Sequence, residues 1–190
     1  MSNGVYKHIA EAWKKPSSGF LRERLIAWRA GDSVVKLDKP TRLDRARALG
    51  YKAKTGIVVA RVRVLRGGRK RPRHEHGRKT RKQHVRKILK MNYRWVAEMR
   101  AAKHFKNLEV LNSYNLAKDG KYYFFDVILV DPTRPEILSD KNYSWIAEKT
   151  NRNRAYRGLT GAAKKSRGLR SKSPTNKNRP SQRSGDRQGK

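Results

Sequence analysis

The run LEVLNSYNLAKDGKYYFFDVILVDP, residues 108–132, decides the fold of this 190-residue chain. Residues 108–114 and 122–130 are rich in aliphatic and aromatic side chains, which favour β-strands. Asp119-Gly120 lies between the two runs, and this pair is typical of a tight hairpin turn. The stretch therefore predicts two antiparallel strands joined as a β-hairpin.

Upstream of the hairpin, the sequence alternates between strand and helix patterns. In residues 57–65, apolar residues alternate with Arg61 and Arg63, which predicts a strand with one apolar and one cationic face. Apolar residues recur at helical spacing from residue 85 to residue 99, which predicts a long amphipathic helix. The same signals predict two N-terminal helices that end before Pro16 and at Gly31, a strand at 34–37 and a short helix at 41–49. The order is two helices followed by β-α-β-α-β-β, which predicts an α+β fold with a mostly antiparallel sheet.

The charge of the chain is strongly positive and unevenly distributed. Lys and Arg number 49 against 15 Asp and Glu, a formal net charge of +34. Residues 61–90 hold 14 basic residues and one acidic residue, residues 151–190 hold 13 and one, and residues 101–150 hold seven of each. We therefore expect a globular α+β domain at 1–150 with a basic insertion at 66–84. The remainder, 151–190, is predicted to be a basic extended tail that is disordered in isolation, with at most a short helix at 161–165.

The composition excludes several classes of protein. The chain has no Cys, which excludes disulfides and thiolate zinc sites. The longest apolar runs, such as residues 127–130, have four residues, whereas a membrane-spanning helix needs about 20. The first residues lack the apolar core of a signal peptide. We expect no membrane partner, no small-molecule substrate, and a protein that stays in the compartment where it is made.

The densest basic run, RGGRKRPRHEHGRKTRK at 66–82, points to a polyanion as partner. Gly67-Gly68 allows close approach of the backbone to another surface, and arginine guanidinium groups pair bidentately with phosphate. Aromatic rings beside basic residues can stack on unpaired bases, and we expect this role for Tyr51 and Tyr156. Core packing is expected instead for Trp28, Tyr123, Phe125 and Trp145.

Catalysis has little support in the sequence. His74, His76 and His84 could chelate a metal or act as acid and base on a phosphodiester, but the surrounding positive charge would repel a metal cation. The carboxylates between residues 126 and 140 are irregularly spaced, which favours turn capping and local ion pairs. No nucleophile elbow, phosphate-binding loop or dinucleotide motif is present. We expect no catalytic residue, metal or cofactor. Besides a structural RNA-binding role, two alternative functions are a DNA-compacting protein and, less favoured, a histidine-dependent RNA nuclease.

Five blocks of sequence carry a resemblance to a known family, and all lie between about residue 6 and residue 170. They are KPTRLDRARALGYKAKTG (39–56), RGGRKRP (66–72), LNSY (111–114), FFDVILVDP (124–132) and RGLTGAAKKSRGLR (157–170). In these blocks the chain closely resembles the archaeal and eukaryotic large-subunit ribosomal protein of the fifteen-e family. The resemblance implies a structural constituent of the large ribosomal subunit in the cytoplasm, without enzymatic activity. Its implied partners are large-subunit ribosomal RNA and neighbouring large-subunit proteins.

The resemblance also implies which segments face ribosomal RNA (rRNA). The RNA-facing runs of the family fall here on Lys52, Lys54, Arg66, residues 69–73 and residues 157–170. There are two departures: Gly161-Ala162 stands where the family pattern has a Ser-Ala or Ser-Ala-Gly stretch, and residues 73–90 and those after 171 match no family pattern. Together with the basic run and the two tyrosines, the candidate rRNA-binding residues are Tyr51, Lys52, Lys54, Arg66, Gly67, Gly68, Arg69, Lys70, Arg71, Arg73, Arg78, Lys79, Arg81, Lys82, Tyr156, Arg157, Lys164, Lys165, Arg167 and Arg170.

Overall fold

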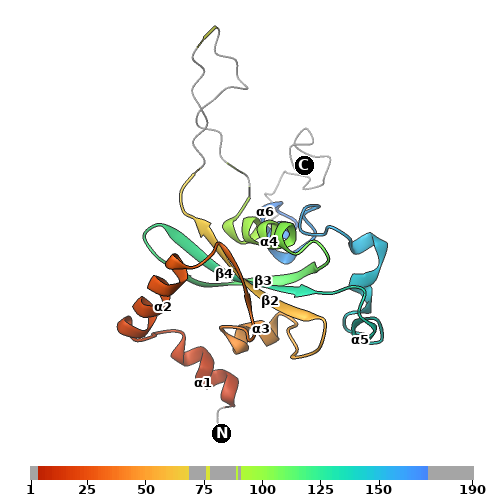
Figure 1. Ribbon diagram of the computed structural model, residues 1–190, viewed down its shortest axis with the longest axis horizontal. Coiled ribbons are helices and arrows are strands. Elements are labelled where there is room, and N and C mark those ends of the chain that lie inside the picture. Colours follow the sequence, from red (N-terminus) through yellow and green to blue (C-terminus); the bar gives the residue numbers. More distant parts are fainter. Residues whose placement is uncertain (1–3, 69–75, 78–88, 90, 171–190) are drawn as a thin grey trace.

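A four-stranded antiparallel sheet with the strand order β1-β2-β4-β3 is the centre of the computed structural model (Figure 1). The structure describes residues 4–68, 76–77, 89 and 91–170. The predicted hairpin is present, and β2 pairs antiparallel with both β1 and β4. The strands are β1 (Val34–Leu37), β2 (Ile57–Leu65), β3 (Glu109–Lys118) and β4 (Tyr122–Val130).

Six α-helices and two short 3-10 helices surround the sheet in the part of the chain that the structure describes. After the two N-terminal helices the order is β1-α3-β2-α4-β3-β4, which confirms the predicted α+β fold. The helices are α1 (Val5–Ala12), α2 (Ser18–Ala30), α3 (Leu43–Ala48), α4 (Tyr93–His104), α5 (Pro135–Leu138) and α6 (Gly161–Ser166), with η2 (Ser144–Ala147) and η3 (Lys149–Asn151).

The two faces of the sheet are covered by different helices because side chains alternate along each strand. α4 packs on the face that carries Val62, Val127 and Leu129, all fully buried. Trp28 of α2 packs on the opposite face with Phe124, with the ring centroids 5.4 Å apart. The sheet thus has an apolar core on each face.

The cationic face predicted for β2 exists but is covered by aromatic rings. The guanidinium of Arg61 lies 4.8 Å from the ring centroid of Trp28, and that of Arg63 lies 4.8 Å from the centroid of Tyr122. Burial lowers the pKa of Arg61, and the carboxylate of Asp126 opposes that shift. These two arginines stabilise the packing of the domain through cation–π contacts.

The prediction of turn capping is wrong for Asp126, the first of the carboxylates between residues 126 and 140. Its side chain is fully buried in β4, and it accepts hydrogen bonds from the hydroxyl of Tyr114 (2.7 Å) and the backbone N–H of Thr41 (3.1 Å). Burial raises the pKa of Asp126, although these hydrogen bonds oppose the shift. Capping is confirmed for Asp131, which accepts the backbone N–H of Thr133 at 3.0 Å.

The long helix predicted from residue 85 begins at Tyr93 instead. Asn92 is the N-cap of α4, and its side-chain oxygen accepts the backbone N–H of Trp95 at 2.7 Å. An N-cap residue has a non-helical backbone, so α4 begins after Asn92. Leu89 is exposed and non-helical, and residues 85–88 lie outside the described part of the chain.

Residues 151–170, which were predicted to belong to a basic extended tail, pack against the domain. Ala155, Thr160 and Ala163 are at most 1% exposed, and the indole N–H of Trp95 donates to the carbonyl of Ala155 at 2.7 Å. The short helix predicted within this segment is α6. Small side chains allow close packing against α4 without large apolar residues. Residues 151–170 are therefore packed on the domain rather than extended, and residues 171–190 lie outside the described residues.

Candidate nucleic-acid interface

The first turn of α4 joins two parts of the chain that are distant in sequence. The backbone N–H of Asn92 donates to the hydroxyl of Ser166 (3.0 Å), and its side-chain amide donates to the carbonyl of Ala162 (2.9 Å), so Asn92 holds α6. The hydroxyl of Tyr93 accepts the backbone N–H of Gly67 (2.9 Å) and donates to the carbonyl of the same residue (3.2 Å). The start of the basic insertion and the cationic α6 therefore meet at one end of α4 (Figure 1).

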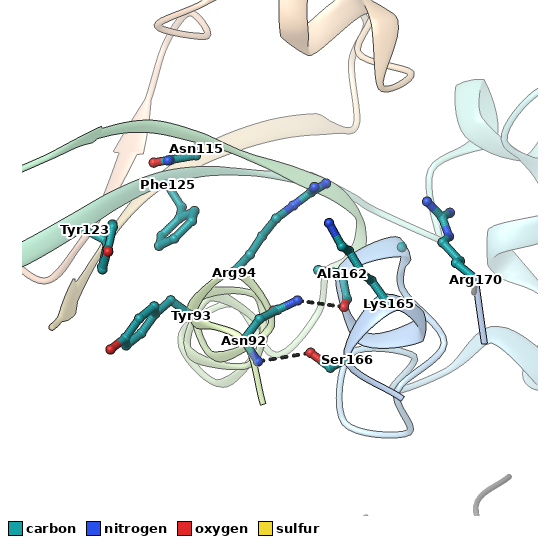
Figure 2. A pocket seen from close by; sticks show the side chains of 11 residues that line it. Asn92, Tyr93, Arg94, Asn115, Tyr123, Phe125, Ala162, Lys165, Ser166 and Arg170 are labelled. Carbon is teal, nitrogen blue, oxygen red and sulfur yellow. Dashed lines mark hydrogen bonds between the residues drawn. The ribbon is translucent and has the colours of Figure 1, made fainter. Parts of the chain in front are cut away.

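An open groove lies at this junction, between β3–β4, the first turn of α4, and α6 with the residues just after it (Figure 2). We call it the α4–α6 groove, and its volume is about 560 Å³. Its lining contains three cationic side chains and no carboxylate. The lining residues are Asn92, Tyr93, Arg94, Asn115, Tyr123, Phe125, Gly161, Ala162, Lys165, Ser166 and Arg170.

Arg94 is held in position within the groove by β3. Its Nε donates to the hydroxyl of Ser113 (2.8 Å), and its Nη2 donates to the side-chain oxygen of Asn112 (2.7 Å). Burial lowers the pKa of Arg94, and the nearby carboxylate of Glu98 opposes this shift. An arginine remains protonated even with a lowered pKa, so a fixed positive charge lies between the sheet and α6.

Behind the groove, Glu98 forms a buried network that fixes α6 and the loop before it. Its two carboxylate oxygens accept the hydroxyl groups of Ser113 in β3 and Thr160. Thr160 is also the N-cap of α6, because its hydroxyl accepts the backbone N–H of Ala163 at 3.4 Å. Burial raises the pKa of Glu98, although the two hydroxyl groups and the positive charge of Arg94 oppose the shift.

Several residues predicted to bind rRNA lie at this junction. Arg66 is exposed, its guanidinium donates to the carbonyl of Asp119, and it lies 5.2 Å from the ring centroid of Tyr123. Arg167 donates to the carbonyl of Gly158 at 2.8 Å and so holds the loop before α6. The other predicted residues brought together here are Gly67, Gly68, Lys164, Lys165 and Arg170, and all five are exposed.

Lys52 and Lys54 are not part of this cluster. They lie in the loop between α3 and β2, on the opposite side of the sheet from α6 (Figure 1). The ammonium of Lys54 is 3.0 Å from the carboxylate of Asp140, and that of Lys52 is 4.0 Å from it. The backbone N–H of Asn142 and the ammonium of Lys54 lower the pKa of Asp140 to about 2. The two lysines therefore form a separate, partly neutralised patch.

The prediction that Tyr51 lies outside the core is wrong. Tyr51 is 8% exposed and packs with Ala46 and Ile128, so its ring is not available to a base. Tyr156 is 40% exposed, and its hydroxyl donates to the carbonyl of Met99 at 3.2 Å. Arg157 donates to the carbonyl of Arg152 at 2.9 Å, which holds it against its own loop.

Except for His76, the remaining candidate residues fall in a part of the chain that the structure does not describe. His76 is described and exposed, whereas His74 and His84 are outside the described residues. Within the ranges that the structure covers, no group of three metal-ligating side chains could hold a metal ion. The predicted contacts outside these ranges are Arg69, Lys70, Arg71, Arg73, Arg78, Lys79, Arg81 and Lys82.

Comparison with known proteins gives the family. The family model described as Ribosomal L15 matches residues 4–185. The large ribosomal subunit protein eL15 of Methanocella arvoryzae is 51% identical over 196 aligned residues, which cover all of both chains. The chain belongs to the L15e family of ribosomal proteins.

As an L15e protein, the chain is a structural protein of the large ribosomal subunit in the cytoplasm and is not an enzyme. This confirms the family expected from the sequence blocks and rules out the nuclease alternative. No helix among the described residues is both long and apolar enough to cross a membrane.

Sequence reasoning found Lys165 and Arg170 of the groove lining but missed Asn92, Arg94 and Glu98. The signal for Asn92 was available, because Asn just before a helical pattern is a preferred N-cap. Arg94 and Glu98 gave no comparable signal, since both occur within an amphipathic helix where charged residues normally face solvent. Their role depends on Ser113 and Thr160, which lie 15 and 62 residues from Glu98 in the sequence.

Proposed function

We propose that this L15e protein binds large-subunit rRNA through the α4–α6 groove and the basic residues around it. One observation carries the proposal: Arg94, Lys165 and Arg170 line the groove with no carboxylate among them. Lys164 and Arg66 add exposed positive charge beside it. The basic insertion begins at the same place, because Gly67 is bound to Tyr93.

The physical basis of this binding is the release of counterions. Cations that contact RNA phosphates displace the condensed counterions of the RNA, and this gain makes affinity fall as salt rises. The described part of the surface supplies such cations from a folded scaffold, so they lose little conformational freedom on binding. Neighbouring large-subunit proteins are the other partners that the proposal includes.

The test compares the salt dependence of binding for two variants of the full chain. Lys164→Gln/Lys165→Gln removes two exposed charges from α6, whereas the control Lys103→Gln/Lys106→Gln removes two exposed charges near the other end of α4. Affinity for transcribed large-subunit rRNA is measured by filter binding over a range of salt concentrations. We expect the α6 variant to lower the log–log salt slope by about 1.4 to 1.8, at about 0.7 to 0.9 per lost phosphate contact.

The control variant is expected to leave the salt slope close to that of the parent protein. Equal losses of slope in the two variants would show that binding is diffuse and would overturn the proposal. Competition with duplex DNA tests the DNA-compacting alternative, because a surface adapted to RNA should release rRNA only at a large excess of DNA.

A further inference from the structure

The α4–α6 groove has two chemically different ends (Figure 2). Tyr93 and Tyr123 are both half-buried and form an aromatic end above the buried ring of Phe125; the ring centroids of the two tyrosines are 4.8 Å apart and tilted by 30°. Lys165 and Arg170 form a cationic end on the α6 side, and Figure 2 shows the side chain of Arg94 between the two ends.

We propose that this groove holds a single unpaired nucleotide of the RNA, with the base at the aromatic end and the phosphate at the cationic end. The inference rests on the proposed function, because it names the element of RNA that this surface selects. Unpaired bases in RNA are recognised by aromatic side chains and by hydrogen bonds to the base edges, which paired bases do not offer. The groove places both kinds of contact beside a phosphate site.

The polar groups of the groove suit a base edge. Asn115 is exposed, and no hydrogen bond of its side-chain amide occurs among the described residues. An amide both donates and accepts, which matches the mixed donor and acceptor pattern of a nucleobase. Arg94 uses its Nε and Nη2 on Ser113 and Asn112, and its Nη1 has no partner within the described ranges. Nη1 thus remains a donor for the ribose or phosphate.

The shape of the groove favours one nucleotide over a duplex. Its walls come from β3, β4, α4 and α6, and its volume of about 560 Å³ lies in the range of about 300–1,000 Å³ that is typical of small-ligand sites. A duplex would contact only the rim, with its bases stacked inside the helix and its phosphates outside. The absence of carboxylates from the lining also disfavours a basic peptide segment as the occupant.

The walls are fixed before any ligand binds. Tyr93 is anchored by both hydrogen bonds to Gly67, and Asn92 fixes α6 through Ser166 and Ala162. A rigid site loses less conformational entropy on binding, which raises affinity for the ligand that fits it. The groove is therefore prepared for a ligand of one shape.

The test uses two RNA hairpins that differ only by one bulged uridine in the stem. The full chain should bind the bulged hairpin about tenfold more tightly than the uninterrupted one, at a salt concentration that weakens contacts to phosphate alone. Asn115→Ala should reduce this preference to about threefold or less, because it weakens binding of the bulged hairpin more than binding of the uninterrupted one. The matched control Asn107→Ala removes an exposed amide just after α4 and should keep the full preference.

Photo-crosslinking locates the bulged base directly. With 4-thiouridine at the bulge, we expect crosslinks to tryptic peptides that contain Tyr93 or Tyr123. Crosslinks confined to other peptides, or a preference that survives Asn115→Ala, would overturn the inference.

The single variant Lys165→Gln separates the two proposals. If Lys165→Gln weakens binding of both hairpins while the parent shows no preference for the bulge, the surface binds RNA but the nucleotide site is wrong. If Lys165→Gln changes neither affinity, the proposed function itself fails, and the inference fails with it.

Discussion

Replacement of Glu98 by Ala tests the buried network that holds the C-terminal segment on the domain. Glu98 is fully buried and accepts hydrogen bonds from the hydroxyl groups of Ser113 and Thr160. Each buried donor left without its acceptor costs about 1–3 kcal/mol, and the cavity left by the missing side-chain atoms adds to this. We therefore expect Glu98→Ala to lower the free energy of unfolding by about 3–5 kcal/mol, a large part of the stability of a typical domain.

The assay is urea unfolding followed by tryptophan fluorescence, since the chain has four Trp residues. Glu98→Gln keeps the size of the side chain and one oxygen acceptor, so its loss should be smaller, about 1–2 kcal/mol. The matched control is Glu23→Ala, an exposed glutamate on α2, which should stay within about 0.5 kcal/mol of the parent. A loss below about 1 kcal/mol for Glu98→Ala would refute the reasoning, because a satisfied and fully buried carboxylate cannot be removed so cheaply.

Three further predictions concern the titrating groups. Burial raises the pKa of Glu98 above its ordinary value of 4.5, so the stability advantage of the parent over Glu98→Gln should be full below that pH and shrink as pH rises through the folded pKa. Urea unfolding near pH 4.5 and near neutral pH measures this advantage, and an advantage that grows with pH contradicts the prediction. Tyr114→Phe removes the 2.7 Å hydrogen bond to buried Asp126 and should cost about 1–3 kcal/mol in the same unfolding assay, so an unchanged midpoint would show that this bond contributes nothing. Lys54→Gln removes a cation from beside Asp140, so carbon-13 NMR of that carboxyl group should show its pKa rising from about 2 toward 3.8. An unchanged pKa would show that the ammonium of Lys54 does not contribute to the shift.

The elements that sequence could predict are those specified by local chemistry. The β3–β4 hairpin follows from strand-forming runs and Asp119-Gly120, and the structure has strands on both sides of that turn. The start of α4 could not be found from apolar spacing alone, because the spacing continues through Leu89 to Asn92 while the cap at Asn92 sets the boundary. The hydrogen bond at the N-cap therefore sets the start of α4, which the apolar spacing does not define.

The packed segment after residue 150 was missed for a different reason. A count of large apolar residues predicts no core there, yet Ala155 and Ala163 are buried because a small side chain allows close approach to α4. Tyr51 was misplaced in the same way, since its basic neighbours in sequence say nothing of the apolar residues that surround it in the fold. The groove likewise depends on residues from separate elements, which only the tertiary structure brings together.

The two edge strands of the sheet, β1 and β3, affect how readily the protein aggregates before it reaches the ribosome. β1 is only four residues long, and β3 is interrupted by two irregularities in its pairing with β4. The guanidinium of Arg154 also donates hydrogen bonds to the carbonyl groups of Val110 and Leu111, beside the first irregularity. Short, kinked or occupied edges do not accept a further strand, which is how natural sheets avoid edge-to-edge aggregation. A newly made chain that has not yet joined the large subunit is thus protected from self-association by its backbone as well as by its charge.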